Sequence, residues 1–183
     1  MPPHADPLDP FAVTHILRRV RSVREFTDRA VPDEILSDIL ETARWTGSGM
    51  NAQPWTLVVV RERATLRAVA EASPNTGHVG GADVAIFLVM DGGGPAALEG
   101  FDEARLAERI LIAATAHGLA SALGWVGADA RESVAVLLGV SPPRTVRTLI
   151  SLGYATEAGA RLKSPAGAAR KPLAEIVRWE RFS

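Results

Sequence analysis

Hydrophobic residues along the chain change their spacing repeatedly, which predicts helices that alternate with strands. In five segments they recur every three to four residues, as on the buried side of an amphipathic helix. In the first helix the residues expected to face inward are Phe11, Ile16 and Leu17. The second begins at Pro32, because proline suits a first helical turn, and ends before Gly47. The predicted helices cover residues 11–19, 32–46, 64–72, 103–117 and 131–138.

Four short runs of β-branched and other apolar residues predict buried strands. Each run is short and flanked by residues that interrupt strands, mostly glycine, proline and charged residues. Residues 73–81 are predicted to be loop, and the glycine-rich residues 91–95 a turn. The predicted strands cover residues 56–60, 83–90, 120–126 and 147–154.

The two ends of the chain lack a hydrophobic period. Residues 1–10 hold four prolines and are predicted to be a loose lead. Residues 155–183 begin with a stretch of alanine, glycine and basic residues, so we expect an extended tail that lies over a surface. A length of 183 residues fits a single domain spanning residues 1–183.

Composition narrows the classes of function. A formal net charge of −1 gives no general attraction to nucleic acid or to anionic membranes, and neither is expected as a partner. The absence of cysteine excludes a disulfide, a thiolate nucleophile and a cysteine-based metal site, and it fits a reducing cytoplasm. No secretory signal is recognisable at the start, so a cytoplasmic protein is expected. The apolar residues 110–126 are predicted to be a buried helix followed by a strand.

The first segment with candidate chemistry is rich in arginine, with five arginines between positions 18 and 29. A guanidinium offers a planar set of donors suited to phosphate, and a serine hydroxyl can donate beside it. Arg21 and Ser22 are therefore candidates to hold a phosphomonoester. A solvated basic helix end is the alternative that the spacing alone leaves open.

The second segment lies between a predicted helix and a predicted strand and includes Ser48, Gly49, Asn51 and Gln53. Asparagine and glutamine each present an acceptor and two donors, which suits the polar edge of a flavin or a nucleobase. Glycine lets backbone approach a flat ligand closely. The alternative is a polar connection whose Trp55 packs in the core.

Together the two segments resemble the nitroreductase family, whose sequences carry approximately R-R-S-x-R-x-F and, at the spacing found here, P-S-x-x-N-x-Q-P-W. Val20 stands where that family has a further arginine, so one customary phosphate donor is missing unless Arg18 or Arg19 replaces it. Residues 118–127, 137–142 and 170–177 resemble later family segments. The residues that match the two motifs are Arg21, Ser22, Arg24, Phe26, Ser48, Asn51, Gln53, Pro54 and Trp55.

The resemblance implies a fold, a cofactor and an oligomer. The fold would be α+β, with a central, mostly antiparallel sheet flanked by helices and an extended C-terminal tail in an intertwined homodimer. FMN would lie at the dimer interface. Arg21 and Ser22 would contact its phosphate and ribityl oxygens, and Arg24 would tune the flavin from its N1 and O2 edge. The other implied FMN contacts are Ser48, Gly49, Asn51 and Gln53 of the partner, Leu123, Gly124 and Trp125 near the ring, and Arg170 and Lys171 over the phosphate.

The implied activity moves a hydride from NADH or NADPH through flavin N5 to a small electron-poor acceptor such as a nitro compound or a quinone, with no catalytic side chain and no metal. A non-catalytic flavin-binding module and a flavoenzyme that runs a dehydrogenation are the alternatives. The four histidines lack metal-ligand spacing and are expected to be solvent-exposed or ordinarily packed, and His78 lies in what is read as a turn. The carboxylates of Asp102, Glu103 and Glu108 are expected to face solvent.

Overall fold

The centre of the molecule is a four-stranded sheet with the order β1-β2-β4-β3, in which all neighbouring strands are antiparallel. The computed structural model describes residues 9–161 and 170–182. The strands are β1 (Trp55–Val60), β2 (Val84–Met90), β3 (Ala120–Trp125) and β4 (Thr145–Gly153). Each lies within two residues of its predicted position, so the predicted strands and the antiparallel sheet are confirmed.

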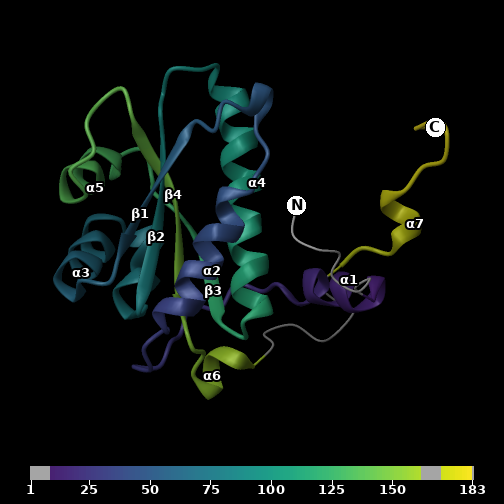
Figure 1. The fold of residues 1–183 in the computed structure, drawn as a ribbon, viewed down its shortest axis with the longest axis horizontal. Helices are drawn as coiled ribbons and strands as arrows, with labels where there is room; N and C mark the ends of the chain where they lie inside the picture. The colour runs from purple at the N-terminus through teal and green to yellow at the C-terminus, as the bar shows by residue number, and fades with distance from the viewer. Residues whose placement is uncertain (1–8, 162–169, 183) are drawn as a thin grey trace.

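Helices cover both faces of the sheet (Figure 1). One face carries α2 (Asp33–Arg44) and α4 (Ala96–Ala116), and the other carries α3 (Arg63–Ala72) and α5 (Arg131–Leu137). These elements confirm the predicted α+β architecture. The remaining helical elements are α1 (Pro10–Arg19), α6 (Glu157–Ala160), α7 (Leu173–Ile176) and two 3-10 segments, η1 (Gly49–Asn51) and η2 (Pro74–Gly81).

The central strand β2 divides the core into two halves because successive side chains of a strand point to opposite faces. Ile86 and Leu88 pack with the residues of α2 and α4, whereas Phe87 and Val89 pack with those of α3 and α5. All seven residues of β2 are buried. A continuous apolar run in the sequence therefore marks the strand that is covered on both faces.

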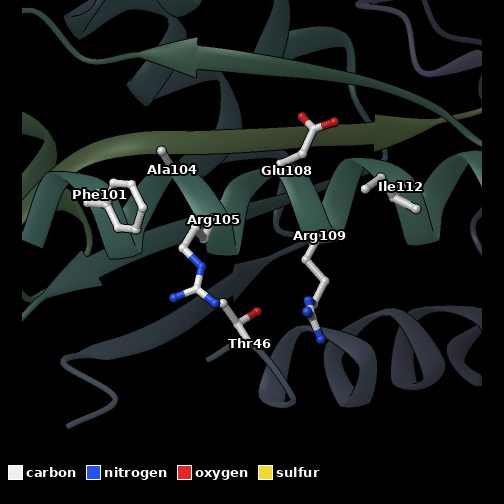
Figure 2. Close-up of a pocket in the computed structure, with 7 residues that line it drawn as sticks. All are labelled: Thr46, Phe101, Ala104, Arg105, Glu108, Arg109 and Ile112. Carbon is white, nitrogen blue, oxygen red and sulfur yellow. The ribbon is translucent and has the colours of Figure 1, made fainter. Parts of the chain in front are cut away.

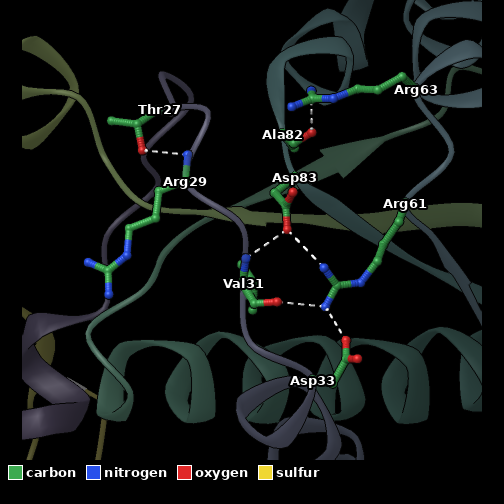
Figure 3. Close-up of polar contacts among 8 residues, drawn as sticks. All are labelled: Thr27, Arg29, Val31, Asp33, Arg61, Arg63, Ala82 and Asp83. Carbon is green, nitrogen blue, oxygen red and sulfur yellow. Dashed lines mark hydrogen bonds and ion pairs between the residues drawn. The ribbon is translucent and has the colours of Figure 1, made fainter.

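A polar cluster fixes the start of α2 to the adjoining edge of the sheet (Figure 3). The Asp83 carboxylate accepts a hydrogen bond from the Val31 N–H at 2.8 Å and from Arg61 Nη1 at 3.1 Å. Arg61 Nη2 donates to the Val31 carbonyl at 2.7 Å and to the Asp33 carboxylate at 3.0 Å. The chain that leads from the arginine-rich segment into α2 is thereby held at Val31.

The prediction that α1 buries its apolar side is wrong for the single chain. No residue of α1 is buried, and Phe11 and Leu17 are 81% and 46% exposed. The sequence has the spacing of an amphipathic helix, but α1 projects from the side of α4 (Figure 1), so Phe11 and Leu17 stay largely exposed in one chain.

Three other predicted segments differ from the structure. Helix α4 begins at Ala96, seven residues before the predicted start, because Pro95 opens a first turn and Gly100 is accommodated inside the helix. The predicted loop at residues 73–81 is largely the 3-10 segment η2. The tail predicted as extended contains the short helices α6 and α7. Residues 1–8, 162–169 and 183, parts of the predicted lead and tail, lie outside the described residues.

The expectation that the acidic residues of α4 face solvent is wrong for two of the three. Asp102 and Glu103 are 7% and 3% exposed, whereas Glu108 is exposed. Glu103 pairs with Arg147 of β4 at 2.6 Å, which offsets the cost of burying its charge. Asp102 accepts a hydrogen bond from the Gly49 N–H at 3.2 Å. Acidic residues on a helix are usually solvated, and nothing local in the sequence marks these two partners.

Within the described part of the chain, no helix is both long enough and apolar enough to cross a membrane. The apolar residues 110–126 form the last part of α4 followed by β3, as the sequence predicts.

Candidate functional site

The arginine-rich segment lies along the outer edge of β3. Ser22 forms a parallel bridge with Ser121, and the Val23 N–H donates to the Ser121 carbonyl at 2.8 Å. Because the pairing is parallel, the chain runs from Ser22 to Arg24 in the direction that β3 runs from Ser121 to Leu123. The structure thus brings two predicted parts of the site, one near the N-terminus and one in β3, to the same edge.

The segment is anchored a second time at Phe26. Phe26 forms an antiparallel bridge with Ala155, and the Thr27 N–H donates to the Tyr154 carbonyl at 2.8 Å. A Cβ atom on Gly153 would lie only 2.9 Å from the Phe26 ring, so the ring occupies space that the glycine leaves free. The aromatic residue of the N-terminal motif therefore acts as a structural anchor for the arginines that precede it.

A hollow of about 540 Å³ lies beside the end of α1. Arg21 lies at its wall, and its Nη1 also donates to the carbonyls of Arg18 and Val20 at 2.8 and 2.7 Å, which caps the last turn of α1. The basic residues and the hydroxyl around this hollow form a donor set suited to a phosphate group. Its lining residues are Leu17, Arg18, Val20, Arg21, Ser22, Glu108, Leu111 and Arg170.

The hollow brings together predicted residues from both ends of the chain. Arg21 and Ser22 come from the N-terminal motif, and Arg170 comes from the tail. Of the two arginines considered as replacements for the one absent at Val20, Arg18 lines the hollow. Lys171 is exposed next to Arg170 and is not one of the lining residues.

The predicted ring-contact residues in β3 differ in their exposure. Leu123 and Trp125 are 37% and 50% exposed and share one face of the strand, whereas Gly124 is buried on the opposite face. A Cβ atom on Gly124 would lie 3.0 Å from the Thr76 methyl group and 3.1 Å from the His78 ring. Segment η2 therefore packs directly against the backbone of β3.

His78 packs against this glycine and is close enough to the arginine-rich segment to be affected by the charge of Arg24. Burial, and then the positive charge of Arg24, hold the pKa of His78 below its usual 6.5. Its Nε2 atom is buried and has no hydrogen-bond partner among residues 9–161 and 170–182. The sequence predicts a turn in this stretch, and no local motif distinguishes His78 from a packed structural histidine. Residues 9–161 and 170–182 contain no group of three or more histidine, aspartate or glutamate side chains that could hold a metal ion.

The loop from Ser48 to Gln53 has an unusual backbone. Met50, Asn51 and Gln53 have φ angles of 51°, 55° and 51°, in the left-handed region that side chains other than glycine rarely adopt. The Ser48 hydroxyl accepts a hydrogen bond from the Gln53 N–H at 2.8 Å, and Gln53 Nε2 donates to the Asn51 carbonyl at 3.2 Å. Asn51 and Gln53 are both exposed, as side chains that bind a ligand must be.

The two motif-bearing segments lie by different parts of α4 in one chain. The loop is joined to Asp102 near the first third of the helix, whereas the hollow touches Glu108 and Leu111 farther along. Figure 1 shows the chain after α2 beside one end of α4 and the chain after α1 crossing nearer its other end. The structure brings Arg21, Ser22, Arg170 and the edge of β3 into one region, and the Ser48–Gln53 loop into another.

Comparison with known sequences gives a family match. Residues 17–83 match the model described as the nitroreductase family. A Thermus thermophilus protein named NADH dehydrogenase is 31% identical, with 92% of this chain and 95% of that protein covered. An Archaeoglobus fulgidus protein, whose name pairs NADH dehydrogenase with NAD(P)H nitroreductase, is 33% identical, with 73% of this chain and 80% of that protein covered.

Comparison with solved structures gives the same fold. An FMN-dependent nitroreductase from Clostridium difficile superposes with a TM-score of 0.82 at 23% identity, over 91% of this chain and 98% of that chain. A structure from Desulfovibrio desulfuricans, assigned as a nitroreductase and solved with FMN, has a TM-score of 0.76 at 27% identity, over 98% of this chain and 100% of that chain.

Proposed function

The chain belongs to the nitroreductase family of oxidoreductases, and from this premise we propose that it binds FMN and transfers reducing equivalents from NADH or NADPH to an electron-poor acceptor such as a nitro compound or a quinone. The observation that carries the proposal is the hollow beside α1, where Arg18, Arg21 and Ser22 offer donors next to the edge of β3. A phosphate at the hollow would leave the rest of the cofactor free to extend along that edge.

The residues present fit such a cofactor. Guanidinium groups and a hydroxyl suit a phosphate dianion, and the exposed amides of Asn51 and Gln53 suit the alternating donors and acceptors of a flavin edge. Bound FMN supplies the N5 atom that receives a hydride and passes it on. The protein's own part is to bind, orient and tune, and no side chain is needed as a nucleophile.

Arg24 is the residue we assign to tuning. It follows the Ser22 bridge by two residues, in the direction in which β3 runs from Ser121 to Leu123. A fixed positive charge beside the ring would offset the negative charge that reduction adds, without any rearrangement at that moment. Strand β3 lies at the edge of the sheet, and the arginine-rich segment pairs with it at Ser121. Backbone groups of β3 beyond Ser121 on this outer side could therefore donate to or accept from a bound cofactor.

We further propose that the working unit is a homodimer in which the loop of one copy completes the site of the other. Separation of the two motif-bearing segments along α4 supports this arrangement. A second support is the set of large apolar side chains that one chain leaves uncovered on α1 and the tail, since patches of this kind mark interfaces. The set comprises Phe11 (81% exposed), Leu17 (46%), Leu173 (71%), Ile176 (63%), Trp179 (87%) and Phe182 (94%).

The test is spectroscopic. Purified protein reconstituted with FMN is expected to show flavin absorption that bleaches with NADH or NADPH under anaerobic conditions and returns when a nitroaromatic or a quinone is added. Steady-state turnover with both nicotinamides against a panel of such acceptors then identifies the donor and the acceptor class. Protein that takes up no FMN would contradict the proposal.

Two other outcomes would indicate a different function. Bound flavin that neither nicotinamide bleaches would indicate a non-catalytic binding module. Bleaching by an organic substrate in the absence of a nicotinamide would indicate an enzyme of this fold that runs a dehydrogenation.

A further inference from the structure

Helix α4 presents three charged side chains to the connection between α2 and β1. Arg109 Nη1 donates to the Trp45 carbonyl at 2.8 Å, and Asp102 Oδ2 accepts from the Gly49 N–H at 3.2 Å. Arg105 lies between them, with Nη2 only 2.9 Å from where a Cβ atom on Gly47 would stand. Figure 2 shows Arg105 and Arg109 directed from α4 toward Thr46 and the end of α2, across a groove of about 420 Å³.

The spacing of these side chains explains their common direction. Positions separated by three and four residues lie on one face of a helix, so Asp102, Arg105 and Arg109 follow one stripe along α4. The stripe meets the connection beside Trp45, Gly47 and Gly49 in succession, and Gly49 lies within the loop from Ser48 to Gln53. The order along the helix runs opposite to the order along the connection, so the connection is held as it passes antiparallel to α4.

Asp102 makes the contact nearest to the proposed ligand residues. Its side chain is 9% exposed, and a buried carboxylate persists only where donors satisfy it. The Gly49 N–H is one donor, and Arg105 Nη1 lies 3.8 Å from the other carboxylate oxygen. Gly49 opens the 3-10 segment η1, and the first N–H groups of a helical turn have no partner within that turn.

The loop from Ser48 to Gln53 needs an external support. Three residues other than glycine with positive φ angles each cost free energy relative to an ordinary conformation, and such strain persists only where the surroundings impose it. The hydrogen bond from the Gln53 N–H to Ser48 closes the loop on itself. The hydrogen bond from Gly49 to Asp102 fixes the closed loop to the body of the molecule.

We propose that Asp102 is a positioning residue for the FMN loop, which keeps Asn51 and Gln53 in a binding-competent conformation by anchoring Gly49 to α4. The proposal rests on the FMN site proposed above. It assigns to a residue outside both sequence motifs a part of the free energy of cofactor binding, because a loop that is already ordered loses less entropy when the ligand binds.

The molecule contains a matched control on the same helix. Glu99 and Asp102 are both 7% exposed as whole residues. The Glu99 carboxylate likewise accepts a hydrogen bond from a glycine, the N–H of Gly94, at 3.0 Å. The loop that Glu99 holds carries none of the proposed flavin contacts. Asp102→Leu and Glu99→Met each replace a carboxylate with an apolar side chain of similar shape, so both remove an acceptor without leaving a large cavity.

The experiment compares these variants in the full chain by hydrogen–deuterium exchange without FMN and by FMN titration. Asp102→Leu is expected to speed exchange of residues 48–53 and to raise the FMN dissociation constant by about tenfold or more. Asp102→Asn keeps an acceptor oxygen but loses the charge, so it is expected to speed exchange and raise the dissociation constant measurably, but by less than Asp102→Leu does. Glu99→Met is expected to speed exchange around Gly94 and to change the dissociation constant less than about twofold, since surface loops away from a site rarely affect it.

Three results would overturn the proposal. They are unchanged exchange of residues 48–53 in Asp102→Leu, an unchanged FMN dissociation constant in that variant, or an equal loss of FMN affinity in Glu99→Met. If Asp102→Leu does not fold, Asp102→Asn must still show measurably faster exchange at Gly49 than the unsubstituted chain. If the unsubstituted chain takes up no FMN, the proposed function fails, while the exchange measurement still reports whether Asp102 holds the loop.

Discussion

Arg21 is in a position to serve two purposes, since its guanidinium caps α1 and also faces the hollow. Arg21→Ala is expected to weaken FMN binding by about 1.5–3 kcal/mol, the range for a hydrogen bond to a charged group. Fluorescence titration of FMN measures this change. Arg19→Ala is the control, because Arg19 lies in the last turn of α1, two residues before Arg21, but does not line the hollow. Equal losses in the two variants would contradict the phosphate assignment.

Arg24 is expected to act on the reduction potential of the flavin more than on its affinity. In Arg24→Ala, loss of a positive charge at the ring should lower the two-electron potential by about 30 mV for each 1.4 kcal/mol of lost interaction. Arg24→Lys keeps the charge and should restore most of the potential. Equilibration with a reference dye under anaerobic conditions measures both variants. A potential that does not move in Arg24→Ala removes the tuning role.

His78 gives the folded protein a predictable response to acid. Because its pKa is below 6.5 in the folded state, the unfolded chain binds this proton first as the pH falls. The contribution of His78 to the free energy of unfolding is therefore constant above about pH 6.5. As the pH falls from there through the lowered pKa, this contribution becomes destabilising. His78→Gln should flatten the dependence of the melting temperature on pH in this window. If the melting temperatures of the unsubstituted chain and of His78→Gln depend on pH in the same way, His78 does not make this contribution.

At the scale of elements, η2 packs closely against β3 near the proposed site. Gly124→Ala should force a Cβ atom against the Thr76 methyl group and the His78 ring, and so lower the free energy of unfolding by about 1–3 kcal/mol. Gly77→Ala, in the same segment η2, is the control, because a Cβ atom there meets nothing within 4 Å. Its effect should stay within about 0.5 kcal/mol, and urea unfolding measures both.

Elements whose burial is decided locally could be predicted from the sequence. Each strand is a short apolar run, and the central position of β2 makes its run continuous. The start of α4 could not be predicted, because residues 96–102 combine a glycine and acidic residues without an apolar period. Burial of Asp102 and Glu103 depends on Gly49 and Arg147, which are distant in the sequence. The predicted ligand residues could be identified from sequence motifs. The residues that hold them in place, such as Asp102, could be identified only from the fold.

At the scale of the whole molecule, the large apolar side chains of the tail are mostly exposed in the part of the chain that the structure describes. If a second copy covers them, Trp179→Ala and Phe182→Ala should each weaken the dimer by more than about 1 kcal/mol, as expected for aromatic anchors. Sedimentation equilibrium measures the dissociation constant. Val136→Ala on α5 is the control, since Val136 is 75% exposed on a different part of the molecule. Tail variants that dissociate no more readily than this control would exclude the tail from the interface.

The polar cluster around Asp83 limits how far the length of the preceding segment can vary. The arginine-rich segment is tied down at Ser22, at Phe26 and at Val31. Inserting or deleting one residue between Ser22 and Phe26 would shift the positions of the two bridges relative to each other, and would disturb at least one of these attachments. A change of length is therefore expected to cost more here than a substitution of an exposed side chain. Indels introduced by mutagenesis should therefore be rejected in this stretch.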